Sequence, residues 1–363
     1  IKIYNNFPFR VNIEVIDELP FQLQNRNFKL EAKLDKKSSG VLQYSIRPLS
    51  RGDYEFGDIL VYVSFPFSFC VRRFKIKTQG NKRVYPSIIQ MKIYQLKVLS
   101  RISRLEGSKK IRRIGQSYEF EQIRNYVEGD DFRHINWKAT SRATGGIKIN
   151  QFEDEKAQAV YCIIDKSRNM KMPFNGLSLM DYAINSSLVI SNSALLKSDR
   201  AGLITFSEKI DTAIKSVNKP GQLSLILNAL YNEKEGQHES NYELLLQYVT
   251  QHVKQRSLLF LYTNFETTHN LYRILPVLRR LNRMHLLVVV MFQNSEIFKL
   301  SKERYQNTPE LYTAVVAEKF IYQKSLIEKE LKINGIKSIL TTPEELTIQT
   351  VNKYLEIKSQ GLI

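Results

Sequence analysis

The sequence predicts an α+β multidomain protein in which an N-terminal β-sandwich-like domain precedes a doubly wound α/β domain. Two patterns lead to this fold class. Up to about residue 85, apolar and polar residues alternate with period two, which is typical of half-buried strands. After residue 157, short apolar runs alternate with stretches of helical spacing, which indicates parallel strands joined by helices. We place the domains at residues 1–86 and 157–363, with a connecting segment at 87–156.

Length and composition agree with two or three domains that bury real cores. The chain has 363 residues, of which 43% are apolar and 25% are charged, close to ordinary globular usage. Glycine and proline are scarce, at 15 and 10 residues, which excludes collagen-like and low-complexity chains. No run reaches the roughly 18 apolar residues that a membrane-spanning helix needs, so the chain itself is expected to be soluble.

The β-sandwich-like domain is expected from short alternating runs that are separated by turn residues. Two such runs are Val11–Ile16 and Tyr54–Phe56, and the second follows a break at Arg51-Gly52-Asp53. Short strands with this spacing are typical of a small β-sandwich. From Ser87 to about Ser103 the apolar spacing becomes helical, so the connecting segment is expected to begin with a helix.

The α/β domain is expected to contain four strands that are buried on both faces, and a shorter fifth strand. In such doubly wound sheets, ligands bind outside the carboxyl ends of the strands, where the strand order reverses. The four apolar runs are Ala159–Ile164, Ala201–Phe206, Leu258–Tyr262 and His285–Phe292, and the short strand is Lys337–Leu340. Helices are expected at Leu177–Leu196, Gln222–Tyr231, Tyr242–Gln255, Leu271–Leu281, Ser325–Ile333 and Pro343–Lys358.

The positive charge of the chain is concentrated in one segment. With 54 Lys and Arg against 36 Asp and Glu, the net charge is +18. Between Arg72 and Arg113, fourteen basic residues accompany the single acid Glu106, so this segment alone contributes +13. It could bind nucleic acid, anionic lipid or an acidic protein surface, or be a solvated arm without a ligand. The basic surface is expected at Arg101, Arg104, Lys109, Lys110, Arg112 and Arg113.

Polar side chains follow two of the predicted α/β strands at the points where these strands end. Asp165 ends the first strand, and Ser167 and Asn169 come two and four residues later. Oxygen ligands at this spacing can face one small, hard cation. Ser240 precedes a predicted helix and Asn264 follows the third strand, so both are expected near Asp165 if the sheet is wound as predicted.

The run from Arg124 to Arg142 resembles the signature R-x-Y-x-x-G-D-x-x-R-x-I-x-W-x-x-x-x-R of bacterial domain-of-unknown-function family fifty-eight. The resemblance extends to Arg51–Gly57, Val84-Tyr85-Pro86 and Tyr354-Leu355, and so covers most of the chain. Proteins of this family place a von Willebrand factor A-like domain after a β-rich region, and they commonly accompany MoxR-type AAA+ ATPases. The resemblance therefore implies that the α/β domain is von Willebrand factor A-like. The signature residues are Arg124, Tyr126, Gly129, Asp130, Arg133, Trp137 and Arg142.

Two roles are open for this signature. Its arginines and aromatic residues could bind an anion or stack on a base. We favour a structural role, in which Asp130 and Asp131 pair with the arginines while Ile135 and Trp137 pin the segment against the α/β domain.

The resemblance also implies a metal-ion-dependent adhesion site, which in von Willebrand factor A domains combines D-x-S-x-S with a Thr and an Asp from later loops. Asp165 and Ser167 match this pattern, whereas Asn169 replaces the second Ser. Ser240 takes the Thr position, and Asn264 stands in place of the later Asp. Magnesium sites rely on one or two carboxylates, and only one remains here. Two alternatives stay open: a degenerate site without a cofactor, and weakly bound Mg²⁺.

The sequence favours a protein that is not an enzyme. It contains no P-loop, no G-x-S-x-G elbow and no H-E-x-x-H motif. A metal-dependent hydrolase is the least favoured class, since one carboxylate without a positioned base makes a poor catalytic site. We expect a non-enzymatic protein-interaction module, an adaptor or chaperone-like partner of a MoxR-type AAA+ ATPase and of other von Willebrand factor A proteins. The alternative, which we favour less, is a nucleic-acid-binding protein that uses residues 72–113.

The expected location is the cytoplasmic face of the bacterial inner membrane. Family members often carry two membrane-spanning helices ahead of the β domain, so the resemblance implies an anchor before Ile1. The basic segment would then lie near an anionic membrane surface. Cys70 and Cys162 lie in apolar runs and are expected to be buried thiols of a reducing compartment.

Overall fold

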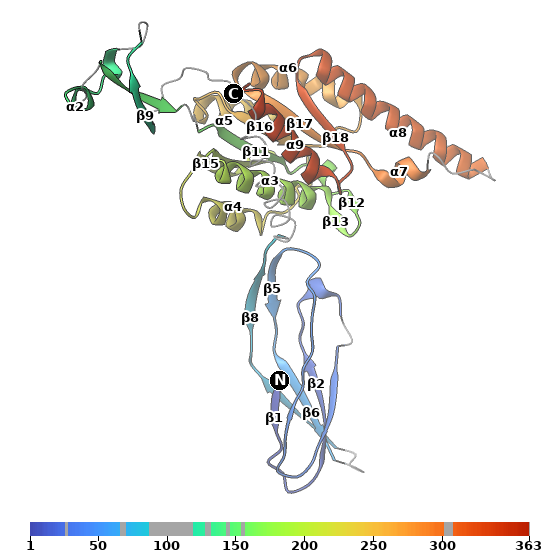
Figure 1. Cartoon of the computed structure of the whole chain (residues 1–363). Coiled ribbons are helices and arrows are strands. Elements are labelled where there is room, and N and C mark those ends of the chain that lie inside the picture. Colours follow the sequence, from blue (N-terminus) through green and yellow to red (C-terminus); the bar gives the residue numbers. More distant parts are fainter. Residues whose placement is uncertain are drawn as a thin grey trace.

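The computed structural model describes residues 1–25, 28–65, 70–86, 119–127, 132–142, 146–153, 157–300 and 308–362. They form an elongated β domain and an α/β domain, with a small arm that stands away from the α/β domain (Figure 1). The helix expected from Ser87 to Ser103 lies outside the described residues. So does the basic surface expected between Arg101 and Arg113.

The β domain consists of antiparallel strands, as its alternating pattern predicts. Strand β2 shows the cause most clearly, since Val11, Ile13 and Val15 are buried while the residues between them are partly exposed. These side chains form a small core with Leu34, which comes from the neighbouring strand β3. The largest sheet has the order β3 (Leu30–Leu34), β2 (Val11–Asp17), β6 (Ile59–Ser64) and β7 (Val71–Ile76). Two further pairs join β1 (Lys2–Tyr4) to β4 (Ser39–Val41) and β5 (Gly52–Phe56) to β8 (Gly80–Val84).

The α/β domain is built on a six-stranded sheet with the order β15-β14-β11-β16-β17-β18. Counted along the chain, this order is 3-2-1-4-5-6, so it reverses between β11 and β16. All neighbours are parallel except β15, which pairs antiparallel with β14 at one edge. The strands are β11 (Ala159–Asp165), β14 (Arg200–Phe206), β15 (Ile210–Val217), β16 (Leu258–Tyr262), β17 (Leu286–Phe292) and β18 (Lys337–Thr341).

Helices cover both faces of this sheet, which confirms the doubly wound α/β prediction (Figure 1). Alternate residues of β11 enter opposite cores, with Cys162 and Ile164 on one side and Tyr161 and Ile163 on the other. The first face carries α3 (Leu179–Leu196), α4 (Gln222–Leu230) and α9 (Leu346–Ser359). The second face carries α5 (Tyr242–His252), α6 (Thr268–Met284) and α8 (Thr308–Ile333).

Two elements of the α/β domain differ from the sequence prediction. Strand β15 was not expected, because only alternate residues of this edge strand are partly buried and no continuous apolar run marks it. Helix α8 begins at Thr308, whereas the apolar spacing predicted only Ser325–Ile333. The earlier turns expose Leu311, Tyr312 and Val315, so they lack the pattern of a helix packed along its whole length.

The signature segment forms the arm. Strands β9 (Glu119–Asn125) and β10 (Lys148–Glu153) make a hairpin, with the short helices η2 (Phe132–His134) and α2 (Trp137–Thr140) between them. The prediction that Ile135 and Trp137 pin this segment against the α/β domain is wrong. Trp137 is 70% exposed, because the arm folds on itself: Ile135 forms a β-bridge with Ile149, and Asn136 donates to Asn150 at 2.8 Å. Asp130 and Asp131 lie outside the described residues.

The β domain meets the α/β domain through the Arg51-Gly52-Asp53 turn. Nη2 of Arg51 donates to the backbone oxygen of Glu233 at 2.7 Å, and the hydroxyl of Tyr231 donates to Asp53 at 3.4 Å. Arg83 also places its guanidinium 5.5 Å from the ring centre of Tyr231, within the range of a cation–π contact. A polar turn thus fixes one end of the β domain beside α4.

The two cysteines differ in their environments. Cys162 is buried in the sheet, where burial raises the pKa of its thiol to about 12. Cys70 is exposed, so the prediction of two buried thiols is wrong for this residue. It precedes β7, an edge strand whose residues are all exposed.

No helix in the described parts of the chain combines the length and the apolar character needed to cross a bilayer.

Candidate functional site

Asp165 is the centre of the site, at the carboxyl end of β11 beside the point where the strand order reverses. Its side chain is 2% exposed and accepts four hydrogen bonds. Oδ1 accepts from the backbone N–H of Ser167 at 2.8 Å and from the hydroxyl of Ser240. Oδ2 accepts from the hydroxyls of Tyr242 at 2.9 Å and Thr263 at 2.7 Å. The structure therefore brings together the three predicted residues Asp165, Ser167 and Ser240.

These four donors leave Asp165 little capacity to bind anything else. An ionised carboxylate has roughly four lone-pair sites, and each of them has a donor here. Burial and the negative charge of Asp165 raise the pKa of Tyr242 well above its usual value, so its phenol keeps its proton and donates. The sequence prediction did not include Tyr242 and Thr263, although Thr263 directly precedes Asn264 and Tyr242 lies two residues after Ser240.

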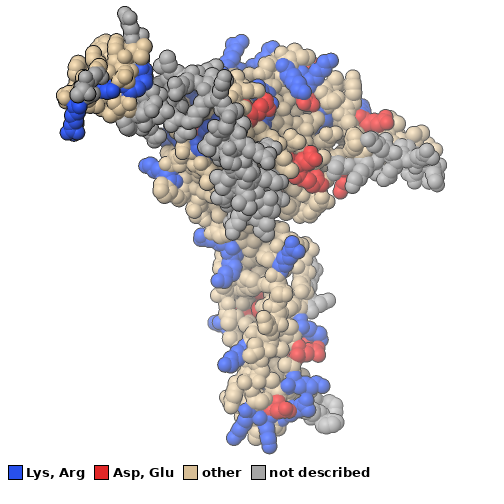
Figure 2. Space-filling model, viewed as in Figure 1, with Lys and Arg blue, Asp and Glu red and all other residues tan. Residues whose placement is uncertain are grey.

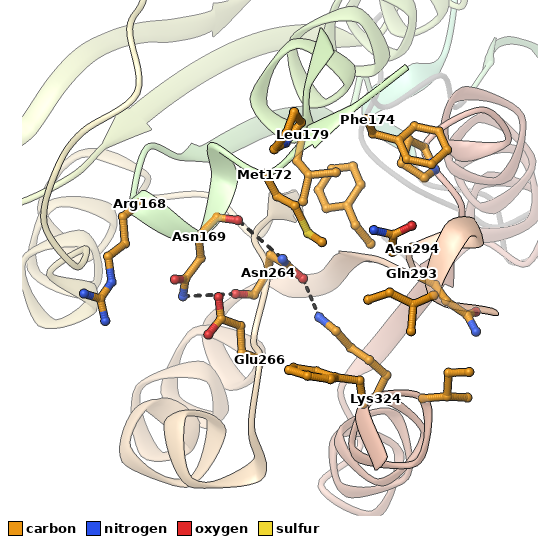
Figure 3. A pocket seen from close by; sticks show the side chains of 16 residues that line it. Arg168, Asn169, Met172, Phe174, Leu179, Asn264, Glu266, Gln293, Asn294 and Lys324 are labelled. Carbon is orange, nitrogen blue, oxygen red and sulfur yellow. Dashed lines mark hydrogen bonds between the residues drawn. The ribbon is translucent and has the colours of Figure 1, made fainter. Parts of the chain in front are cut away.

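Asn169 and Asn264 form a second pair next to Asp165. The side-chain amide of each donates to the backbone oxygen of the other at 3.4 Å (Figure 3). The side-chain oxygen of Asn264 instead accepts from the ammonium of Lys324, which comes from α8. This oxygen is the one that the predicted metal site would require from Asn264, and it already faces a cation.

Lys324 is a member of the site that the sequence did not reveal. Besides Asn264, its Nζ donates to the backbone oxygen of Phe265 at 2.6 Å. Burial lowers the pKa of Lys324 to about 8, although the charge of Glu266 acts in the opposite direction. In the sequence, Lys324 lies among the apolar residues Phe320, Ile321 and Ile327. This apolar setting is a signal that could have indicated a partly buried lysine.

A pocket of about 370 Å³ opens beside the two asparagines and Lys324 (Figure 3). The turn Asn175-Gly176, with φ of 47° and 79°, closes the hairpin of β12 (Pro173–Phe174) and β13 (Leu177–Ser178), which supplies part of the wall. Its apolar lining includes Met172, Phe174, Leu179, Phe292, Ile297 and Phe320. Its polar lining includes Arg168, Asn169, Asn264, Glu266, Gln293, Asn294 and Lys324.

The loop that carries Ser240 is held over the edge of the sheet by a paired charge cluster. Lys166 forms ion pairs with Glu233 at 2.6 Å and Asp211 at 3.1 Å. Burial lowers the pKa of Lys166, but the hydrogen bonds and charges of these two acids outweigh burial and raise it. Gly236 donates to the backbone oxygen of Lys166 at 2.6 Å, and a Cβ on Gly236 would lie 2.8 Å from that oxygen. These charges are satisfied within the fold and serve to hold the loop.

The structure does not bring the signature residues to Asp165. Arg124, Tyr126, Trp137 and Arg142 lie in the arm, and Arg133 belongs to its helix η2. Gly129 and Asp130 lie outside the described residues. Figure 2 shows Lys and Arg side chains on the arm, along the β domain and on the α/β domain. Within the residues that the structure describes, no three His, Cys, Asp or Glu side chains are grouped as metal ligands.

Comparison with known proteins identifies a family over the middle of the chain. A family model described as "Protein of unknown function DUF58" matches residues 122–300. This match includes the whole signature run and about the first two thirds of the α/β domain, and it confirms the resemblance found in the sequence. No curated protein matches the chain.

Three solved structures show a weak similarity. The crystal structure of the SpRpn10 VWA domain is 10% identical with a TM-score of 0.35, over 54% of this chain and 95% of that one. Proximal thread matrix protein 1 from the mussel byssus is 10% identical with a TM-score of 0.28, over 52% and 42%. An uncharacterized membrane spanning protein from Vibrio fischeri is 11% identical with a TM-score of 0.20, over 55% and 98%. At these TM-scores, none of the three assigns a function or a partner to this chain.

Proposed function

We propose that this chain, whose residues 122–300 match the DUF58 family model, is a protein-interaction module whose α/β domain binds a partner at the carboxyl edge of its sheet. The observation that carries this proposal is the pocket at the reversal of the strand order, which is preformed and lined mainly by apolar side chains. Pockets at this place in doubly wound sheets are where ligands bind.

The occupied state of Asp165 favours binding over catalysis. A general base or nucleophile needs a free lone pair that faces the substrate. Asp165 uses its lone pairs on Ser167, Ser240, Tyr242 and Thr263. The nearby acids Glu233 and Asp211 are paired with Lys166. These contacts support a site that recognises rather than transforms its ligand.

The same contacts favour a degenerate site without a metal ion. Mg²⁺ prefers carboxylate and water ligands. Here the single carboxylate is saturated by neutral donors, and Asn264 faces the ammonium of Lys324. A divalent cation would have to displace these donors and lie close to a positive charge, so we expect no bound Mg²⁺.

The partner that we propose is a MoxR-type AAA+ ATPase, with other von Willebrand factor A proteins as further candidates. Pull-down with the full chain against a MoxR-type ATPase from the same organism tests this partner, with the ATPase in its nucleotide-free, ADP-bound and ATP-analogue-bound states. We expect binding in at least one state. Absence of binding in all three states contradicts the adaptor role.

We also propose that the protein works at the cytoplasmic face of the inner membrane, with its basic residues toward anionic lipid. In the described part of the basic segment, Arg72, Arg73, Lys75 and Lys82 are exposed on β7 and β8. Each such charge near an anionic surface contributes about 1 kcal/mol. The full chain should therefore sediment with vesicles that contain phosphatidylserine and not with pure phosphatidylcholine vesicles. Equal sedimentation with both contradicts this location.

A further inference from the structure

We infer that the pocket beside Asn264 binds an acidic side chain of a protein partner, whose carboxylate pairs with the ammonium of Lys324 while a neighbouring apolar side chain fills the rest of the pocket. This inference rests on the proposed function, since it names the chemistry that the interaction module recognises. Three observations lead to it.

The first observation is that Lys324 has unused capacity. An ammonium has three donors, and the structure provides two acceptors, the side-chain oxygen of Asn264 and the backbone oxygen of Phe265. Both acceptors are neutral. Within the described residues, no carboxylate lies at ion-pair distance from Lys324. One N–H and the full positive charge therefore remain for a ligand.

The second observation is the contrast with other partly buried lysines of the same domain. Lys166 is paired with Glu233 at 2.6 Å and Asp211 at 3.1 Å, and Lys358 is paired with Asp199 at 2.8 Å. A charge that is withdrawn from water is costly unless an opposite charge accompanies it. Lys324 differs from these two lysines, since both of its acceptors are neutral and the exposed Glu266 in the same pocket lining does not form an ion pair with it.

The third observation concerns the walls of the pocket. A volume of about 370 Å³ lies in the lower part of the range of small-ligand sites, roughly 300–1,000 Å³. Phe174, Phe292 and Phe320 are among the apolar side chains that surround it. Arg168 is also in the lining, but its side chain is 65% exposed and its guanidinium pairs with Glu239 at 3.9 Å, so it is not counted as a charge for the ligand. The exposed acid Glu266 is also in the lining, but it makes no ion pair with Lys324. The occupant therefore needs a carboxylate next to an apolar group.

Two peptides that differ only in a carboxylate or a carboxamide test the inference. They are added to the full chain without any protein partner. We would titrate acetyl-Leu-Glu-Leu-amide and acetyl-Leu-Gln-Leu-amide into the isotopically labelled protein at millimolar concentrations and follow amide NMR shifts. We expect the Glu peptide to bind about tenfold more tightly than the Gln peptide, which corresponds to about 1.4 kcal/mol. Equal affinities, or no binding of the Glu peptide, overturn the inference. A third titration uses octanoate, and tighter binding of octanoate than of the Glu peptide also overturns it, in favour of a small-molecule ligand.

Variants on α8 show whether Lys324 carries the preference. In Lys324→Met, the advantage of the Glu peptide should disappear, whereas Lys324→Arg should retain most of it. The matched control is Lys319→Met, which removes an exposed lysine from the same helix outside the pocket lining and should leave both affinities unchanged. Circular dichroism of each variant verifies the fold. A preference for the Glu peptide that persists in folded Lys324→Met overturns the inference.

The results separate this inference from the proposed function. If the ATPase binds wild type and Lys324→Met equally while no peptide preference is found, the interaction role stands and the acidic-ligand inference fails. If the peptide preference is found and no ATPase binds in any nucleotide state, the pocket chemistry stands and the adaptor role fails.

Discussion

The guanidinium of Arg51, in the β domain, pairs with the carboxylate of Asp181, in the first turn of α3 in the α/β domain. Asp181 also accepts from the backbone N–H of Ser178 at 3.0 Å and so completes the capping box of α3. One carboxylate thus caps a core helix and fixes the neighbouring domain. The next residue, Gly52, has φ of 126°, a conformation that favours glycine, so the turn that presents Arg51 depends on it. The conspicuous sequence run Arg51–Gly57 therefore has a structural role at the domain junction.

Replacement of Arg51 should loosen this junction. The side chain of Arg51 is only 9% exposed, and Arg51→Ala removes both the ion pair with Asp181 and the bond to the backbone oxygen of Glu233. Truncation of one partner in such a pair costs about 2–5 kcal/mol. We expect a larger radius of gyration in small-angle X-ray scattering, with both domains still folded. Arg47→Ala, at an exposed arginine of the same domain, should leave the radius unchanged. An unchanged radius in Arg51→Ala contradicts the junction described here.

The hydrogen bonds of Asp165 should matter for stability. Asp165→Asn removes the charge that receives four donors, and hydrogen bonds to charged groups contribute about 1.5–3 kcal/mol. The free energy of unfolding in urea should fall by about this amount. Asp35→Asn, which neutralises an acid whose side chain is 80% exposed, should change it by less than about 0.5 kcal/mol. Equal stability of wild type and Asp165→Asn would show that the four bonds have no net effect.

Addition of Mg²⁺ should not stabilise the protein. A bound ligand raises the free energy of unfolding by RT ln(1 + [L]/Kd). Since Asp165 is saturated by donors and Asn264 faces the ammonium of Lys324, we expect no shift in the melting temperature with millimolar Mg²⁺ or Mn²⁺. Isothermal calorimetric titration of Mg²⁺ or Mn²⁺ into the protein measures binding directly, and we expect no heat of binding. A shift that occurs in wild type and is lost in Asp165→Ala would establish a metal site instead.

Lys324 should make the protein less stable at neutral pH than a neutral side chain would. Its pKa is about 8 in the folded protein and about 10.5 in the unfolded chain, so between these values the unfolded chain binds more protons. The free energy of unfolding attributable to Lys324 therefore rises with pH from about 8 to about 10.5. Lys324→Met should be more stable than wild type by about 1–3 kcal/mol at pH 7, and the difference should shrink over that window. Urea unfolding at several pH values measures it, and a less stable Lys324→Met at pH 7 contradicts the expected burial cost.

The single tryptophan should report on the arm. Trp137 is 70% exposed, so its fluorescence should have the emission maximum of indole in water and be quenched efficiently by acrylamide. Trp137→Phe should change the free energy of unfolding by less than about 0.5 kcal/mol, as is usual for exposed positions. A blue-shifted emission that resists quenching would show that the arm is packed against another surface.

The α/β domain was readable from the sequence because its strands are buried on both faces. All seven residues of β11 are buried, which produces a continuous apolar run that ends at Asp165. Given parallel strands, the carboxyl ends must lie on one edge, so the approach of Ser240 and Asn264 to Asp165 followed from the order of elements along the chain. Local patterns and one topological rule were sufficient for this part.

The position of Lys324 and the exposure of Trp137 could not be predicted from the sequence. Lys324 lies 60 residues beyond Asn264 in the sequence, and their contact depends on how α8 crosses the edge of the sheet, which no local pattern encodes. The composition of the signature segment favours burial of its only tryptophan, but the arm satisfies its own backbone through the Ile135–Ile149 bridge and leaves Trp137 outside. The contact of Lys324 and the exposure of Trp137 depend on tertiary packing, which the periodicity of apolar residues does not determine.

Glu233 is held by side chains from both domains. Arg51 of the β domain holds its backbone oxygen, while Lys166, the residue after Asp165, holds its carboxylate. Separation of the two domains would break the bond between Arg51 and Glu233. The residue at the domain junction is therefore also the residue that anchors the loop that leads to Ser240, at the same edge of the sheet as the pocket.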